Sequence, residues 1–128
     1  MLKGIHHVAI ICSDYQTSKA FYRDTLECEV IDENYRAERD SYKCDLRLPD
    51  GNQIELFSFP GAPVRPSGPE AQGLRHLSFR VSNVQAAVDW LSEKGVDCEP
   101  VRIDPYTGKA FTFFKDPDDL PLELYQVD

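Results

Sequence analysis

Alternating apolar and polar residues, with clusters of β-branched side chains, predict four short strands in the first 60 residues. The predicted strands are 5–11, 29–31, 42–48 and 53–59. A helix is predicted over 15–26, because Ser13 and Asp14 can cap its first turn. Residues 49–52 (Pro-Asp-Gly-Asn) are typical of a hairpin turn between the last two strands. The predicted order is strand, helix and three strands.

The second half of the chain repeats this order. Strands are predicted at 74–81, 97–103, 110–114 and 122–126. A helix is predicted over 84–94, where Ser82 and Asn83 can cap the start and Gly95 ends the last turn. Its apolar residues recur with helical spacing, which indicates one buried face.

Between the halves, residues 60–69 contain four prolines and two glycines, which excludes a helix or a central strand. We therefore predict one domain of two modules, about 1–60 and 73–128, joined by a connector at 61–72. Each module alone, at about 60 residues, would be marginally stable. The modules should therefore pack on one another or on a second chain.

Histidines and glutamates recur at matched positions in the two modules. Asp14 and Asn83, the expected helix caps, each follow a histidine, His7 or His76, by seven residues. Glu55 lies 48 residues after His7, and Glu123 lies 47 residues after His76. Unrelated segments would seldom agree this closely, so the spacing indicates a duplicated half-site.

The two glutamates stand between bulky apolar neighbours, so strand alternation turns their carboxylates to the opposite face. A carboxylate alone on a partly buried sheet face is unfavourable, and a metal ion can compensate it. Two imidazoles and two carboxylates suit Zn²⁺, Ni²⁺, Co²⁺, Mn²⁺ or Fe²⁺. A lone strand His or Glu is more often structural, but the matched set of four favours metal ligands. His6 is expected on the opposite face, as a structural or supporting residue.

Net charge and hydropathy narrow the classes of partner. The chain has 128 residues and a formal net charge of −8, which argues against nucleic acid and anionic membranes as partners. The longest apolar run near the N-terminus, residues 8–12, is too short for a membrane span or a signal peptide. We expect a cytoplasmic protein whose four cysteines, none in a Cys-x-x-Cys pair, are free thiols rather than zinc ligands.

Four segments together resemble the vicinal oxygen chelate superfamily of glyoxalases, bleomycin resistance proteins and dioxygenases. These are Gly-Ile-His-His-Val-Ala-Ile at 4–10, Ile-Glu-Leu at 54–56, Gly-Leu-Arg-His-Leu-Ser-Phe at 73–79 and Asp-Pro-Asp-Asp-Leu-Pro-Leu-Glu-Leu at 116–124. The resemblance implies an α+β fold of two paired βαβββ modules, whose curved mixed sheets surround one divalent metal.

The His/Glu/His/Glu pattern is similar to that of bacterial glyoxalase I, so the resemblance implies metal ligands His7, Glu55, His76 and Glu123. It implies Ni, Zn or Co as the metal, ahead of Mn or Fe. The metal-bound carboxylates would move protons, with Glu123 as the base and Glu55 as its partner. The implied activity is that of a metal-dependent lyase or isomerase, similar to lactoylglutathione lyase, acting by proton transfer on a small hydroxycarbonyl substrate.

The sequence departs from glyoxalase I at the positions that hold glutathione. Ile11 and Phe59 stand where those enzymes carry an arginine and an asparagine, so the resemblance does not extend to glutathione recognition. Asp119 occupies the usual glycine position in the turn before the last ligand. Other substrate contacts are predicted at Lys43 and Arg36. Phe111 and Phe113 are predicted contacts as well, and these two rings can wall a pocket or fill the core.

Two other functions stay open from sequence. One is metal-free binding of an antibiotic, which an acidic chain of this family could perform on a cationic drug. The other is a ring-cleaving dioxygenase, disfavoured because the fourth ligand fills a position that dioxygen or substrate would need. A homodimer is expected, and the metal ligands can come from one chain or two.

Overall fold

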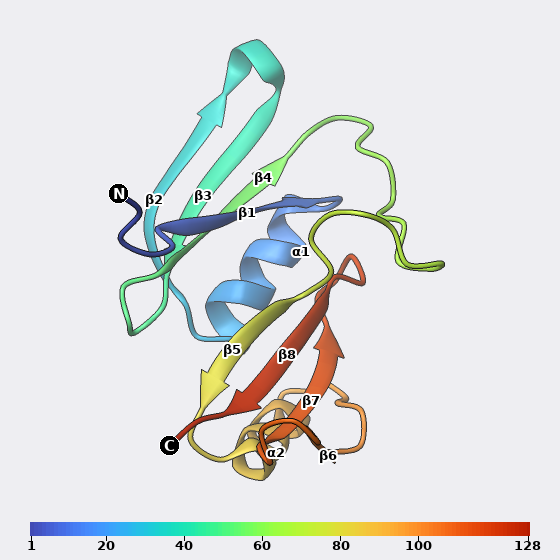
Figure 1. Ribbon diagram of the computed structural model, residues 1–128. Helices are drawn as coiled ribbons and strands as arrows, with labels where there is room; N and C mark the ends of the chain where they lie inside the picture. The colour runs from blue at the N-terminus through green and yellow to red at the C-terminus, as the bar shows by residue number, and fades with distance from the viewer. The chain divides into compact units, whose positions relative to one another are not determined.

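The computed structural model describes all of residues 1–128, which divide into two compact units, Met1–Val64 and Arg65–Asp128. Each unit holds one four-stranded mixed sheet and a helix (Figure 1). The predicted fold class, α+β with two repeated modules, is confirmed. No helix is long and apolar enough to cross a membrane.

The sheet of the first unit has the strand order β1-β4-β3-β2, in which β1 runs parallel to β4 and the other pairs are antiparallel. Its elements are β1 (His7–Cys12), α1 (Tyr15–Ala20), η1 (Phe21–Thr25), β2 (Glu29–Arg36), η2 (Ala37–Arg39), β3 (Ser41–Arg47) and β4 (Gln53–Ser58). In β4, Ile54 and Leu56 are buried, so Glu55 projects from the other face. Register places Glu55 beside Ala9 of β1 and Asp45 of β3.

The predicted helix over 15–26 is only partly correct. The N-cap is as expected, because the Thr17 N–H donates to Asp14 Oδ1 at 2.9 Å. From Phe21 the helix widens into a π-helical segment, η1, in which Tyr22 is fully buried. Glu27 then adopts a positive φ of 60°, which ends the helix.

The second unit repeats the topology, with strand order β5-β8-β7-β6 and a parallel pair between β5 and β8. Its elements are β5 (Leu77–Val81), α2 (Val84–Glu93), β6 (Arg102–Ile103), β7 (Ala110–Lys115) and β8 (Pro121–Gln126). Asn83 caps α2 by accepting from the Ala86 N–H at 3.0 Å. Glu123 pairs with Ser78 of β5 and Phe113 of β7.

Several predicted strand boundaries need correction. β1 and β5 begin two and three residues later than expected, so His76 lies just before its strand. β2 continues to Arg36, through a register shift between Val30 and Asp32 that breaks the alternation used to predict it. In the expected strand 97–103 only β6 pairs regularly, because Pro100 offers no N–H to the ladder.

The turn before β8 is held by Asp116, which is 5% exposed. Its Oδ1 accepts from the N–H groups of Asp118 and Leu120, both at 2.9 Å. Asp119 adopts a φ of 65°, the left-handed conformation that glycine tolerates best. The turn thereby fixes where β8, with Glu123, enters the sheet.

All four cysteines are free, as expected, and Cys12, Cys28 and Cys44 are buried. Burial raises the pKa of Cys28 to about 11. A buried thiol with a raised pKa is a poor nucleophile and a poor metal ligand, so these residues act as small core side chains.

Candidate metal-binding site

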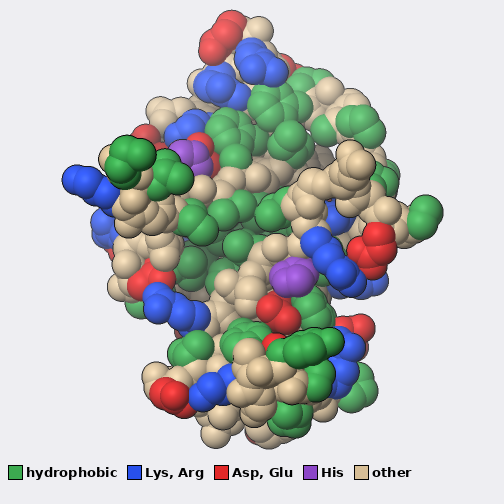
Figure 2. Space-filling view, in the orientation of Figure 1, with side chains coloured by type: hydrophobic (Ala, Val, Ile, Leu, Met, Phe, Trp, Pro, Cys, Tyr) green, Lys and Arg blue, Asp and Glu red, His purple; other side chains and the backbone are tan.

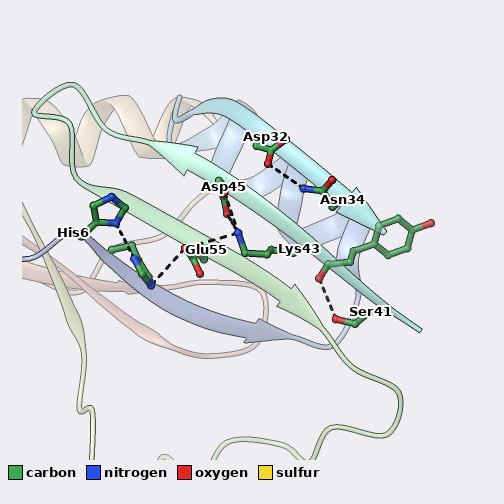
Figure 3. Close-up of polar contacts among 9 residues, drawn as sticks. His6, Asp32, Asn34, Ser41, Lys43, Asp45 and Glu55 are labelled. Carbon is green, nitrogen blue, oxygen red and sulfur yellow. Dashed lines mark hydrogen bonds and ion pairs between the residues drawn. The ribbon is translucent and has the colours of Figure 1, made fainter. Parts of the chain in front are cut away.

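In the first unit the structure brings His7 and Glu55 together on neighbouring strands. His7 Nε2 lies 3.5 Å from Glu55 Oε2, and the two side chains are 39% and 16% exposed. His6 Nδ1 lies 2.9 Å from His7 Nδ1, so the expected separation of these rings is not observed. His6 precedes β1 and is not bound by strand alternation. Its contact leaves His7 Nε2 facing Glu55 (Figure 3).

The second unit contains the equivalent pair. His76 Nε2 lies 3.6 Å from Glu123 Oε1, and the side chains are 30% and 12% exposed. The His76 ring meets Phe113 edge-on, with centroids 5.0 Å apart. In the space-filling view, histidine side chains lie next to acidic side chains at the surface (Figure 2). Both predicted His/Glu pairs therefore exist within their own units.

The geometry of each pair suits two ligands of one metal ion. Two donor atoms at about 2.1 Å from an ion, at an angle of about 90–110°, lie about 3.0–3.4 Å apart. The observed separations of 3.5 and 3.6 Å approach that range and exceed a normal hydrogen bond. Neither Glu55 nor Glu123 accepts a hydrogen bond, although both are mostly buried. Apart from the histidines, only Lys43, whose Nζ lies 3.9 Å from Glu55 Oε2, brings positive charge to either carboxylate, so a metal cation would add compensation at both.

Each pair supplies two donors, fewer than a protein metal site requires. No third His, Cys, Asp or Glu joins either pair into a larger ligand group. A structural or catalytic ion usually takes three or four protein ligands. Each pair is therefore half of a possible ligand set.

Lys43, a predicted substrate contact, is bound to a carboxylate that the sequence did not single out. Its Nζ lies 2.8 and 3.0 Å from the two oxygens of Asp45 and 3.9 Å from Glu55 (Figure 3). The hydrogen bonds to Asp45, with the charges of Asp45 and Glu55, raise the pKa of Lys43. The ammonium group thus remains positive beside Glu55. Arg47 instead pairs with exposed Glu29, 3.1 Å away.

Arg36, the second predicted basic contact, lies at the end of β2. Its guanidinium covers the Phe57 ring at 5.1 Å, on the face of β4 that carries Glu55. The Arg36 Nη2 donates to Ser41 Oγ at 3.0 Å, while its Nε is buried without a partner. Arg36 was predicted to lie outside a strand, because the predicted strand ended at residue 31. Its contact with Phe57 has no local signal in the sequence.

In the second unit, Phe111 and Phe113 of β7 lie on the face of the sheet that carries Glu123. Both are partly exposed, so neither belongs to the fully buried core. Arg102, which the sequence did not indicate, lies over both rings at 5.0 and 5.8 Å. A cavity of about 720 Å³ in this unit is lined by His76, Phe113 and Arg102, among other residues. Its volume is within the range of small-molecule sites.

The sequence comparisons place this chain among uncharacterised relatives in one family. A family model described as "Glyoxalase/Bleomycin resistance protein/Dioxygenase superfamily" matches residues 4–124. The uncharacterized protein YwkD of Bacillus subtilis (strain 168) is 61% identical over 98% of both chains. The uncharacterized protein YaeR of Escherichia coli (strain K12) is 58% identical over 98% of this chain and 97% of its own.

Solved structures agree with that match. A glyoxalase family protein from Enterococcus faecalis has a TM-score of 0.91 and 49% identity, covering 97% of this chain and 98% of its own. The fosfomycin resistance protein FosX from Listeria monocytogenes, solved as an E126Q mutant with Mn(II) and a dihydroxypropylphosphonic acid, has a TM-score of 0.73 and 22% identity. It covers 100% of this chain and 95% of its own, and at this identity it supports the fold alone.

Proposed function

Because the chain belongs to the Glyoxalase/Bleomycin resistance protein/Dioxygenase superfamily, we propose that it is a metal-dependent lyase or isomerase. Its substrate is a small hydroxycarbonyl compound. One divalent ion is held by His7, Glu55, His76 and Glu123, contributed by one chain or by two. The proposal rests on the repeated His/Glu pair, whose donor atoms are 3.5 Å apart in one unit and 3.6 Å apart in the other.

The donor set favours Ni²⁺, Zn²⁺ or Co²⁺, with Mn²⁺ or Fe²⁺ as further candidates. FosX, which shares this fold, was itself solved with Mn(II). When bound, such an ion acts as a Lewis acid that stabilises negative charge developing on substrate oxygen. All four cysteines lie outside this donor set, and three are buried.

Two carboxylates serve the proton transfer. We assign Glu123 as the base that removes a proton from the carbon beside the carbonyl, and Glu55 as its partner in the proton transfer. Neither carboxylate accepts a hydrogen bond, so uptake of a proton breaks no hydrogen bond at either of them. Phe113 meets the His76 ring edge-on and, with Phe111, forms an apolar surface beside the His76/Glu123 pair.

Basic residues complete the substrate contacts. Lys43 is held by Asp45 next to Glu55, where its positive charge can stabilise oxygen anions. Arg36 lies farther along the face of β4 that carries Glu55, over the ring of Phe57. Ile11 and Phe59 replace the glutathione contacts of glyoxalase I, so the substrate is a smaller compound than a glutathione adduct.

Metal analysis tests the proposal. We expect protein purified without added metal, then stripped and titrated with Ni²⁺, Zn²⁺ and Co²⁺, to bind one ion per four-ligand set. His7→Ala and His76→Ala should each weaken binding at least about 100-fold, since each removes a direct ligand. Glu29→Gln, which removes an exposed carboxylate paired with Arg47, is the matched control. Absence of tight uptake would instead favour metal-free binding of a small molecule.

Activity is tested by exchange of the carbon-bound proton. Metal-loaded protein should catalyse deuterium exchange from D₂O into dihydroxyacetone, followed by NMR, and Glu123→Gln should lower the rate by about 100-fold or more. The hemithioacetal of methylglyoxal and glutathione should be a poor substrate. Efficient turnover of that hemithioacetal would overturn the assignment of a smaller substrate.

We also propose a cytoplasmic homodimer. β1 is an edge strand, and Ile5, just before it, and Ile11, within it, are 72% and 57% exposed. A second chain would bury this apolar edge and satisfy its backbone groups. Light scattering after size exclusion should give twice the 14.6 kDa chain mass, and a monomer would contradict the proposal.

A further inference from the structure

The four arginines of the first unit fall into two groups. Arg23 and Arg47 are exposed and pair with carboxylates, at 2.7 Å from Asp24 and 3.1 Å from Glu29. Arg36 and Arg39 have no carboxylate partner. In a chain of net charge −8, two uncompensated guanidinium groups close together are unexpected.

Both unpaired arginines lie on phenylalanine rings of and just after β4. Arg36 covers Phe57 at 5.1 Å and Phe59 at 5.7 Å, and Arg39 covers Phe59 at 4.7 Å. The two rings are themselves stacked, with centroids 5.9 Å apart. Figure 2 shows basic side chains at the tip of the β2–β3 hairpin beside a hydrophobic patch. We call Arg36, Arg39, Phe57 and Phe59 the arginine–phenylalanine patch.

Stacking on the phenylalanine rings holds these guanidinium groups in a conformation that can bind an anion. A guanidinium lying on an aromatic face keeps its in-plane N–H donors available and loses little conformational freedom when it binds. The donors match the two oxygens of a carboxylate or phosphate. Arg102 of the second unit is also stacked on two phenylalanines, but Glu99 lies 3.5 Å from its Nη2. Of the arginines stacked on phenylalanine rings, only Arg36 and Arg39 have no carboxylate within ion-pair distance.

The patch also lies at a useful distance from the proposed metal ligand. Phe57 and Phe59 follow Glu55 by two and four residues, and residues two apart on a strand share a face. At about 3.3 Å per residue, the rings lie roughly 7 and 13 Å along the chain from Glu55. A small molecule bound at Glu55 can therefore reach Arg36.

We infer that the arginine–phenylalanine patch binds an anionic group, a carboxylate or a phosphate, at the far end of the substrate. The substrate is then a small organic acid that carries oxygens for the metal at one end and a negative charge at the other. This inference depends on the proposed function for the chelated end, whereas the anion site itself requires no metal.

The test is an NMR titration of the metal-free protein with phenylphosphonate, benzoate and benzyl alcohol at low ionic strength. The two anions should bind saturably and shift amide signals around Arg36, Arg39 and Phe57, whereas neutral benzyl alcohol should bind at least about tenfold more weakly. Comparison of phenylphosphonate with benzoate tells which anion is preferred. Added salt should weaken both anions.

Arg36→Gln should weaken anion binding about tenfold, because it removes a charged donor. Arg39→Gln, at a fully surface position, should weaken binding with an unchanged fold even if Arg36→Gln unfolds the unit. Arg47→Gln is the matched control and should bind as the parent does. Equal binding of benzyl alcohol, an unaffected Arg39→Gln, or an equal loss in Arg47→Gln would each overturn the anion site.

The outcomes separate this inference from the proposed function. Tight metal uptake without anion binding at the patch would leave the metal-dependent activity standing and remove the anionic substrate. Anion binding that is lost in Arg39→Gln, in a protein that takes up no metal, would support the patch and remove the metal-dependent activity.

Discussion

At the scale of single residues, the two proposed metal-binding glutamates have different surroundings: Glu55 lies beside Asp45 and the ammonium group of Lys43, whereas Glu123 lies beside Phe113. Glu55 and Glu123 were identified because each stands between buried apolar neighbours, and strand alternation alone turns them to the other face. Asp45 was not identified as a neighbour of Glu55, because that contact depends on the β3–β4 register. Register joins residues ten apart in the chain and has no local signal.

Asp119 offers a test at this scale. Its φ of 65° is unfavourable for a residue with a Cβ, so Asp119→Gly should stabilise the protein by up to about 1 kcal/mol. Urea denaturation measures the change. Asp118→Gly, at a neighbouring residue without a positive φ, should be destabilising because it adds freedom to the unfolded chain without relieving any backbone strain. A loss of stability in Asp119→Gly would contradict the reading of this turn.

At the scale of elements, α1 is tied to β2 by a polar cluster. Lys19 Nζ lies 2.7 Å from Glu33 Oε2, and the Tyr15 hydroxyl donates to the same oxygen. The ring of Tyr15 stacks on Tyr42 of β3 at 4.4 Å. Helix α1 was predicted from its N-cap. Its contacts with the sheet could not be predicted, because the bulge in β2 interrupts the alternation from which the full length of that strand would be recognised.

The Glu33 cluster should make stability depend on acid pH. The hydrogen bond from Lys19, then that from Tyr15, lowers the pKa of Glu33 below its ordinary value of 4.5. Its contribution is therefore complete above pH about 4.5 and is lost as the pH falls through the lowered value. Because Glu33 is 37% exposed, the contribution is about 1 kcal/mol or less.

Glu33→Gln measures this contribution. The variant should be less stable than the parent at pH 7, and the difference should shrink as the pH falls from 5 to 3, as followed by urea denaturation. Glu29→Gln, on the same strand, changes a carboxylate that pairs only with exposed Arg47 and serves as the control. A constant difference across this pH range would show that Glu33 acts through packing alone.

At the scale of the whole molecule, each unit has a complete sheet and one His/Glu pair, which under the proposed function is half of the metal ligand set. An ion that binds only the folded protein stabilises it by about 4 kcal/mol at a concentration a thousand times its Kd. Saturating metal should therefore raise the Tm by about 10 °C or more. Calorimetry with and without EDTA measures the shift.

The two half-sites can be compared by the same measurement. If one ion uses both pairs, His7→Ala and His76→Ala should each remove nearly the whole metal-dependent shift in Tm, since either change leaves too few ligands. Two independent sites would instead lose about half of the shift in each variant. Glu29→Gln should keep the full shift.

The order of the elements, the duplication and the two His/Glu pairs could be predicted from the amino-acid sequence. These depend on alternation, helix caps and spacing, which are properties of neighbouring residues and of a repeated motif. Three contacts could be found only in the folded chain: Lys43 binds Asp45, His6 contacts His7, and Arg36 lies on the ring of Phe57. Strand register, the β2 bulge and the ends of strands produce these contacts, because backbone pairing between distant segments fixes which side chains meet.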